Sequence, residues 1–187
     1  MNHKGTVRLE TDRLILRRYV IDDAEVMYRN WASIDEVTEF LTWPTHKSVD
    51  VTKEIVNGWI SKYDDPAFYN WAVELKEIGE VIGNISVVRH NDKVGSADIG
   101  YCMGNRWWGQ GIMPEAAGAV LEFLFTEVGF NRIAAMHSRE NAKSGRVMQK
   151  IGMQYEGTLR QAGLRYHGVV DEVWYSVLRD EYQNNKR

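Results

Sequence analysis

The spacing of hydrophobic residues changes along this chain, and each change predicts a different element. A short aliphatic run at residues 14–16, bounded by charged residues, predicts a first strand. After Asp22, apolar residues recur at intervals of three and four, which predicts a helix and a second short helix behind it. A longer helix is predicted from Ser48 or Asp50, with one apolar side formed by Val51, Ile55, Trp59 and Ile60.

The middle of the chain changes to strand-like sequence. Residues 68–75, 81–88 and 97–103 are rich in β-branched and aromatic side chains and are separated by polar turns. This pattern predicts three neighbouring antiparallel strands. A helical apolar stripe then follows and ends at Gly129, which predicts a well-defined helix.

The C-terminal third predicts a strand, a helix and a hairpin. The strand covers residues 132–137, the helix begins at Asn141 and ends at Gly152, and the hairpin strands cover 154–164 and 169–178. Together the elements predict a mixed α/β fold with about seven strands in one mostly antiparallel sheet and about four helices.

The segment between the fourth strand and the next helix is the strongest candidate for ligand binding. It reads Arg106-Trp107-Trp108-Gly109-Gln110-Gly111, and the helix begins with Ile112-Met113-Pro114-Glu115. Gly109 and Gly111 can adopt backbone angles that point successive N–H groups at one anion. The first amides of the helix are unpaired and lie at the positive end of its dipole. The segment therefore predicts a pyrophosphate site built from main-chain amides.

A Gly-x-Gly pair alone is weak evidence, because ordinary tight turns at a helix entry use the same residues. The segment lacks the Gly-Lys-Ser/Thr ending of a P-loop and the third glycine of a dinucleotide fingerprint. A phosphate-binding module of another kind stays open at this point.

Composition narrows the classes of function. The chain has 187 residues, of which 44% are hydrophobic and 26% charged, and no linker or repeat interrupts it, so we expect one domain over residues 1–187. A net charge of −3 gives no electrostatic reason to expect a nucleic-acid partner. The N-terminus lacks a signal peptide and no apolar stretch approaches a membrane span, so we expect a cytoplasmic protein without a membrane partner.

Cysteine and histidine usage argues against disulfide and metal chemistry. The single cysteine, Cys102, excludes an internal disulfide and has no evident activating partner in the sequence. The five histidines are scattered and match no ligand spacing, so we expect no metal.

The order of elements and the place of the glycine turn resemble the GNAT superfamily of acyl-CoA-dependent N-acetyltransferases, over nearly the whole chain. Arg106-x-x-Gly109-x-Gly111 looks like the acetyl-CoA signature of that superfamily. Two further motifs resemble the branch that contains the ribosomal-protein N-terminal acetyltransferases: Asn141-x-x-Ser144, and Glu156-Gly157-x-Leu159-Arg160 ahead of Asp171. The resemblance also implies a sheet that splays between the fourth and fifth strands.

By this resemblance, the chain is expected to move an acetyl group from acetyl-CoA to a primary amine by direct transfer in a ternary complex. The branch implies a protein N-terminal amino group as the acceptor, and a small-molecule amine such as a polyamine, an antibiotic or an amino-acid-like amine is the alternative. A non-catalytic acyl-CoA-binding domain is a further alternative, because Met148 stands where related enzymes often have a tyrosine that acts as the general acid. Methionine cannot donate a proton.

The resemblance places the cofactor-binding residues in three segments. Main-chain groups of the fourth strand would hold the acetyl oxygen and the pantetheine, the turn would hold the pyrophosphate, and the helix that begins at Asn141 would lie beside the thioester. The residues are Tyr101, Cys102, Met103, Arg106, Gly109, Gln110, Gly111, Ile112, Met113, Asn141 and Ser144.

Two residues are implied for catalysis. Ser144 is expected to act as an acid at the CoA sulfur. Asp98 stands where some superfamily members carry a catalytic glutamate. Its side chain is one methylene shorter, so it would reach the amine through a water. Glu74 is the alternative candidate for the base. An α-amino group, with a pKa near ~8, is partly neutral at pH 7 and needs no dedicated base.

The sequence allows two interpretations of the acceptor groove and two of the phosphate contacts, and it is compatible with a homodimer. Seven aromatic and apolar residues either wall a groove above the acetyl group or belong to the core: Trp31, Phe40, Leu41, Trp43, Pro44, Tyr166 and His167. A basic stripe of Arg139, Lys143, Arg146 and Lys150 either binds the CoA phosphates or is solvated. Exposed apolar residues of the last strands, including Trp174, would allow a homodimer.

Overall fold

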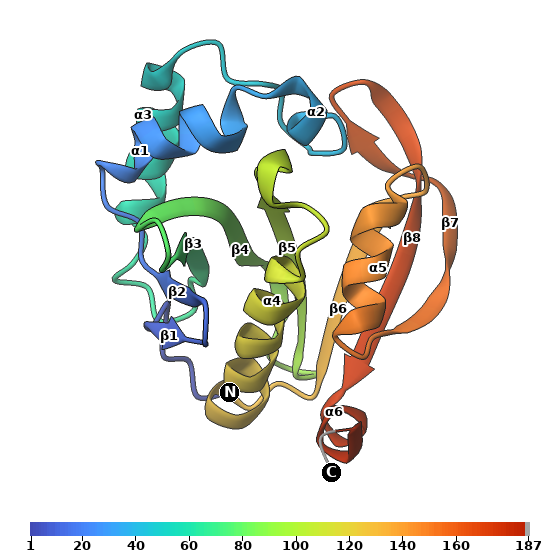
Figure 1. Cartoon of the computed structure of the whole chain (residues 1–187). Helices are drawn as coiled ribbons and strands as arrows, with labels where there is room; N and C mark the ends of the chain where they lie inside the picture. The colour runs from blue at the N-terminus through green and yellow to red at the C-terminus, as the bar shows by residue number, and fades with distance from the viewer. Residues whose placement is uncertain (186–187) are drawn as a thin grey trace.

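An eight-stranded sheet organises the computed structural model, which describes residues 1–185 (Figure 1). The strand order is β1-β2-β3-β4-β5-β6-β8-β7, and every neighbouring pair is antiparallel except β5 with β6. The strands are β1 (Leu9–Glu10), β2 (Leu14–Arg17), β3 (Asn70–Leu75), β4 (Glu80–Asn91), β5 (Ser96–Met103), β6 (Arg132–Ser138), β7 (Gln154–Arg165) and β8 (Gly168–Leu178). The mixed α/β fold is confirmed, and the two-residue edge strand β1 accounts for the eighth strand.

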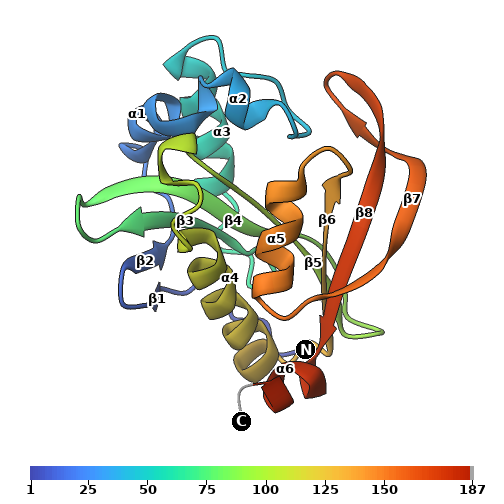
Figure 2. The same ribbon diagram turned by 45° about the vertical axis from the view of Figure 1, so that its right-hand side comes forward.

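Helices cover both faces of the sheet (Figure 2). One buried cluster joins the sheet to α4 and α5, and a second joins its other face to α1 and α3. The helices are α1 (Asp23–Met27), α2 (Asp35–Thr38), α3 (Val49–Ile60), α4 (Ile112–Phe123), α5 (Ala142–Lys150) and α6 (Arg179–Asn185). The six described helices exceed the expected four because α2 is a single short turn and α6 follows the last strand.

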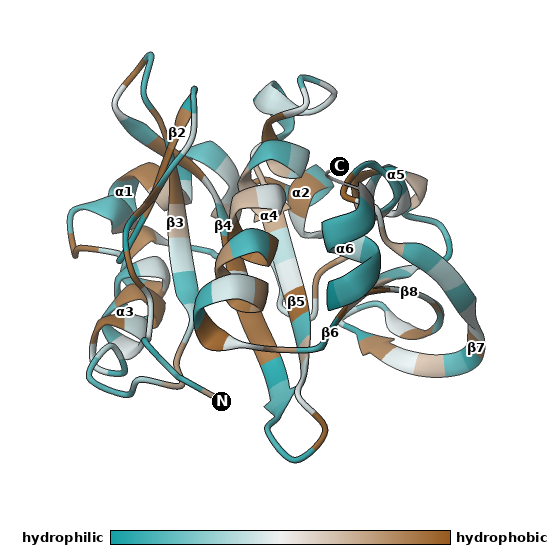
Figure 3. Ribbon diagram, turned by 90° about the horizontal axis from the view of Figure 1, so that it is seen from below, coloured by the Kyte–Doolittle hydropathy of each residue, from teal (hydrophilic) through white to brown (hydrophobic). Residues whose placement is uncertain are grey.

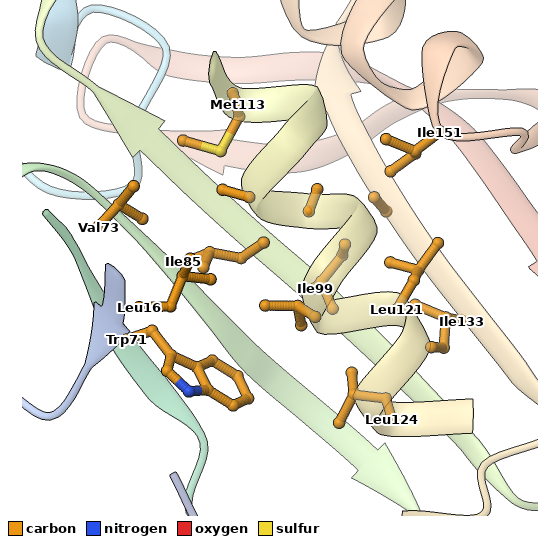
Figure 4. Close-up of a cluster of buried hydrophobic side chains, with 14 of the residues drawn as sticks. Leu16, Trp71, Val73, Ile85, Ile99, Met113, Leu121, Leu124, Ile133 and Ile151 are labelled. Carbon is orange, nitrogen blue, oxygen red and sulfur yellow. The ribbon is translucent and has the colours of Figure 1, made fainter. Parts of the chain in front are cut away.

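The helix α4 lies across the sheet with its apolar side against the strands (Figure 4). Met113 and Leu121 of the helix belong to the same buried cluster as Ile85 of β4 and Ile99 of β5, and Leu121 lies beside Ile133 of β6 in Figure 4. Burying an aliphatic side chain of this size contributes about 1.5–3 kcal/mol. This packing fixes the start of α4, and therefore the glycine turn, relative to β5.

The predicted apolar side of α3 is confirmed at Trp59 and Ile60, which pack against the second buried cluster, and is wrong at Val51 and Ile55. Thr52 and Val56 are fully buried, whereas Val51 and Ile55 are 39% and 41% exposed. The buried side continues to Trp59, whose ring lies 4.9 Å from that of Tyr19. Neighbouring positions on a helix differ by about 100°, so the aromatic contact with Tyr19 decides which of two adjacent stripes turns inward.

The sheet opens between β5 and β6, as the resemblance implied. These parallel strands pair only over Ser96–Asp98 and Arg132–Ala134, and β5 then continues for five residues beside β4 alone. Alternate main-chain groups of β5 beyond Asp98 therefore face the gap without a strand partner. The structure confirms the splay.

Hydropathy follows the layers of the fold (Figure 3). The helix α4 carries both hydrophobic and hydrophilic segments, as expected of a helix with one buried side, while α6 is largely hydrophilic. Across residues 1–185, none of the helices combines the length and the apolar character that a bilayer crossing requires.

Candidate active site

The glycine turn has the backbone geometry that the sequence predicted. Gly109 and Gly111 have φ angles of +78° and +75°, in the left-handed region that favours glycine, and Gly111 is the N-cap of α4. Within residues 1–185, the amides of Gly109, Gln110 and Gly111 donate to no protein acceptor. Together with the first amides of α4, they form a set of donors available to an anion.

Hydrogen bonds of Gln110 and Arg13 hold the turn from behind. The side-chain amide of Gln110 donates to the main-chain carbonyl of Arg106 at 3.1 Å, and the main-chain carbonyl of Gln110 accepts from Arg13 Nη1 at 3.0 Å. Arg13 also donates through Nε to Glu115 in the first turn of α4, at 2.6 Å. The predicted residues Arg106 and Gln110 do not line the adjoining cleft. The hydrogen bond between them fixes the shape of the turn.

A cleft of about 780 Å³ runs from the glycine turn along the splay. Its walls are the end of β5, the start of α4, one side of α5 and the segment around α2. The residues predicted to bind the cofactor that line it are Tyr101, Cys102, Met103, Gly109, Gly111, Ile112, Met113, Asn141 and Ser144. The fold thus brings nine of the eleven predicted residues together around one space.

The end of β5 is held in place by a tryptophan of the turn. Trp108 Nε1 donates to the carbonyl of Met103 at 2.8 Å, so the turn and the strand edge form one unit. Beside them, burial raises the pKa of the Cys102 thiol to about 12. A thiol with so high a pKa stays protonated near neutral pH, which agrees with the expectation that Cys102 is no nucleophile.

The helix α5 presents Ser144 to the cleft. The Asn141 side chain caps this helix by accepting from the amide of Ser144 at 3.2 Å. The Ser144 hydroxyl donates to the Tyr101 hydroxyl at 3.0 Å, and that hydroxyl donates to the Ser144 carbonyl at 2.9 Å. Burial raises the pKa of Tyr101 well above its ordinary value, so the phenol remains a neutral hydrogen-bonding group.

The Tyr101 hydroxyl is a site group that the sequence analysis missed, because it considered only the main chain of this residue. On a strand, positions 99, 101 and 103 share one face. Since Ile99 and Met103 are core residues beneath α4, the alternation would have predicted that Tyr101 faces the helices.

The basic stripe of α5 lies partly in the cleft. Lys143, Arg146 and Lys150 line it, and the Lys143 ammonium lies 4.0 Å from the centroid of the Trp108 ring. Arg139 instead pairs with Asp171 of β8, at 3.5 Å. Three cations therefore border the space that begins at the glycine turn.

Comparison with known proteins identifies the family. A family model described as an acetyltransferase (GNAT) domain matches residues 13–154, which is most of the chain. The chain belongs to the GNAT acetyltransferase family. It is an enzyme of the N-acetyltransferase class, and the matched span includes the glycine turn, β5 and α5.

Relatives of this GNAT protein share both sequence and fold. YoaA of Bacillus subtilis, named as an uncharacterized N-acetyltransferase, is 30% identical over 171 residues, which cover 91% of this chain and 96% of the relative. The [ribosomal protein uS5]-alanine N-acetyltransferase of Escherichia coli is 29% identical over 164 residues, covering 81% and 80%. The crystal structure of a GNAT-family acetyltransferase from Bacillus anthracis superposes with a TM-score of 0.82 at 26% identity, covering 93% and 99%.

The two carboxylates considered as bases of the acetyltransferase are held by arginines and do not line the cleft. Arg89 Nε donates to Asp98 at 2.8 Å, and Arg17 Nε donates to Glu74 at 2.6 Å. Asp98 lies three positions before Tyr101 on the same strand, so its side chain is on the opposite face of the sheet from Ser144. The structure thus separates Asp98 from the predicted acid.

Met148, at the position of the tyrosine acid in related enzymes, is a core residue with 1% exposure. It packs into the buried cluster under α4 and α5. A methionine there stabilises the fold and leaves Ser144 and Tyr101 as the hydroxyl groups of α5 and β5 that line the cleft.

The predicted acceptor wall divides into core and cleft residues. Trp31 is fully buried and Trp43 packs against the same cluster, whereas Phe40 and Leu41 line the cleft beside α2. Arg165 of β7 donates through Nε to the Phe40 carbonyl at 3.2 Å, which ties the hairpin to this wall.

The remaining residues of the predicted wall, and Trp174 of β8, do not line the cleft. Pro44, Tyr166 and His167 are absent from the described cleft lining. Trp174 is half-buried: its indole donates to Glu172 at 3.2 Å, and the Arg89 guanidinium lies 6.0 Å from its ring. The apolar residues most exposed on this hairpin are Leu164 and Val169.

Proposed function

We propose that the whole chain works as one N-acetyltransferase domain that moves an acetyl group from acetyl-CoA directly to a protein N-terminal amino group. The GNAT family uses acetyl-CoA. The observation that supports this function best is the continuity of one cleft from the unpaired amides of Gly109, Gln110 and Gly111 to the β5 edge and Ser144.

Each wall of the cleft has a role in the proposed reaction. The amides of the turn and of α4 would hold the pyrophosphate, and Lys143, Arg146 and Lys150 would neutralise further phosphate charge. The exposed edge of β5 would donate to the acetyl oxygen, where negative charge develops as the amine nitrogen attacks. Donors already in place at such a position are each worth about 3 kcal/mol of barrier lowering.

Proton movements complete the proposed mechanism. The amine nitrogen forms the new C–N bond and the C–S bond breaks, while the Ser144 hydroxyl hydrogen-bonds the departing sulfur or protonates it. The proton that the nitrogen loses passes to water, or replaces the proton that Ser144 has given up. The acceptor amine enters neutral, which an α-amino pKa near ~8 allows. Asp98 is held by Arg89 on the opposite face of the sheet, so we assign it no proton transfer in the proposed mechanism.

The acceptor class rests on the relatives. The Escherichia coli relative is named for the alanine of a ribosomal protein, and it matches 81% of this chain. We therefore propose an exposed protein N-terminus, reached in the cytoplasm, ahead of a small amine. A homodimer through the β7–β8 hairpin is compatible with this role, since the most exposed apolar residues of the hairpin, Leu164 and Val169, do not line the cleft.

A mass-resolved acetylation screen tests the proposal. Purified protein and acetyl-CoA are incubated with N-terminal peptides, with the same peptides blocked at the α-amine but containing lysine, and with polyamines. We expect a gain of one acetyl group on free peptide N-termini and none on blocked peptides. Turnover of polyamines alone would favour the small-amine function, and tight CoA binding without any turnover would favour a non-catalytic domain.

A further inference from the structure

Two histidines that are far apart in the sequence meet one aspartate at the turn that joins β4 to β5. His3 belongs to the N-terminal segment, His90 lies near the end of β4, and Asp92 begins the turn. His3 Nε2 lies 3.0 Å from Asp92 Oδ2, and His90 Nδ1 lies 2.9 Å from Asp92 Oδ1. The three side chains thus direct two ring nitrogens and a carboxylate into one small space.

The spacing of these atoms suits a transition-metal ion. The three ligand atoms all lie within 4.8 Å of one another. In a tetrahedral shell with ligand bonds of about 2.0–2.1 Å, neighbouring ligand atoms are about 3.3 Å apart. Each imidazole nitrogen is at present hydrogen-bonded to a different oxygen of Asp92, at 3.0 Å and 2.9 Å, so binding would require side-chain rotations that bring both nitrogens and one oxygen around the ion.

The surroundings orient His3 in the way that metal ligands are usually oriented. Its other ring nitrogen, Nδ1, lies 2.9 Å from the hydroxyl of Tyr69, which is fully buried. When Nδ1–H donates to this oxygen, the lone pair of Nε2 points toward Asp92. The buried ring of Phe130 packs against both imidazoles, with centroids 5.9 Å from His3 and 6.2 Å from His90.

Access from solvent is available on the side of the aspartate. The side chains of His3, His90 and Asp92 are 15%, 31% and 48% exposed, so the two rings are anchored while the carboxylate stays open. An ion held there would have room for water as a fourth ligand. None of the three residues lines the cleft between β5 and α5.

We propose that His3 Nε2, His90 Nδ1 and an Asp92 carboxylate oxygen bind a divalent transition-metal ion of the zinc type. The ion joins the N-terminal segment to the β4–β5 turn, and its role is structural because the site is separate from the cleft. Two imidazoles favour zinc or cobalt over magnesium and calcium, which prefer all-oxygen shells.

The test uses the full chain without a histidine tag, treated with a chelator and then titrated by calorimetry with Zn²⁺. We expect one ion per chain, and a melting temperature raised by about 5–11 °C when free Zn²⁺ exceeds Kd by a factor of about 100. Co²⁺ serves as a spectroscopic probe, because it should show the intense visible absorption of a four-coordinate site. Mg²⁺ should have no effect.

Three variants identify the ligands. His3→Gln and His90→Gln should each weaken Zn²⁺ binding at least tenfold, and Tyr69→Phe should weaken it about tenfold through loss of ring orientation. The matched control is His167→Gln, on the β7–β8 turn, which should bind like the parent. Circular dichroism of each variant without metal verifies its fold.

Two results would overturn the proposal. One is the lack of a one-to-one Zn²⁺ site in the parent protein. The other is Zn²⁺ binding of parental affinity in His90→Gln, because His90 would then not be a ligand. Acetyl transfer should be the same with and without Zn²⁺, so this test is independent of the proposed reaction.

Discussion

The Ser144 hydroxyl of α5 donates a hydrogen bond to the Tyr101 hydroxyl of β5, 3.0 Å away. Tyr101 completes the contact by donating to the Ser144 carbonyl at 2.9 Å, so one phenol fixes both the side chain and the main chain of the serine. To reach a sulfur in the cleft, the serine hydroxyl has to turn away from the phenol. Tyr101 is therefore expected to hold the helix in place, and Ser144 to act on the reactants.

Ser144→Ala and Tyr101→Phe separate these two roles. If the serine hydroxyl assists the departing thiolate, Ser144→Ala should lower kcat about 100-fold with little change in the KM for acetyl-CoA. Tyr101→Phe keeps the serine hydroxyl, so it should lower kcat by less than tenfold and mainly reduce stability, by about 1 kcal/mol. Steady-state kinetics and urea unfolding give both quantities. An unchanged kcat in Ser144→Ala would remove the acid role.

The glycine turn gives a second prediction. Gly111→Val should weaken CoA binding about 10- to 100-fold, because a branched residue resists a φ of +75° and its side chain enters the anion path. The protein should still fold, since a Cβ at this position comes no closer than 3.7 Å to another atom, Arg13 Nη2. The matched control is Gly118→Ala, in the middle of α4 with open space around it. Calorimetric titration with CoA should show parental affinity for the control only.

Glu115 should make part of the stability depend on pH. Burial alone would raise its pKa, but hydrogen bonds from Thr11 and Arg13 outweigh this and lower it. A carboxylate with a lowered pKa stabilises the fold above its ordinary pKa of about 4.3, and this contribution disappears as the pH falls through the lower folded value. The unfolding free energies of parent and Glu115→Gln should therefore differ most at pH 6 and converge toward pH 3.

Urea unfolding at several pH values measures this difference. The control is Glu77→Gln, which removes one exposed charge from the β3–β4 turn without touching Arg13. A gap between parent and Glu115→Gln that stays constant from pH 6 to pH 3 would contradict the interpretation.

Local signals in the sequence predicted the backbone geometry of the glycine turn and the cap of α5 correctly. The positive φ angles at Gly109 and Gly111, the start of α4 and the cap at Asn141 depend on residues only a few positions apart. Such features follow from backbone preferences and short-range hydrogen bonds. The order of helices and strands was predicted from the same kind of local pattern. The splay of the sheet was predicted from the resemblance to the family.

Contacts between distant segments could not be read from the sequence. The hydroxyl pair of Tyr101 and Ser144 is separated by 43 residues, and the meeting of His3 with His90 depends on where the N-terminal segment crosses β4. Asp98 stands at a plausible catalytic position along the chain, but the alternation of β5 directs it to Arg89 on the other face. The partner of a side chain, and the face of the sheet on which it lies, depend on the register of the strands, which is known only from the fold.

The closeness of α5 to β6 gives the last prediction. A Cβ at Gly145 would lie 2.7 Å from Nε2 of the buried His137, so Gly145→Ala should force α5 outward and cost about 1–3 kcal/mol. Because Ser144 is the preceding residue, kcat should fall as well. Gly58→Ala, on a helix position with open space, is the control and should be neutral or stabilising. Adding His137→Ala to Gly145→Ala makes room for the new methyl group, so a double-mutant cycle should give a favourable coupling of at least about 0.5 kcal/mol. Strictly additive effects would mean that His137 does not set the position of α5.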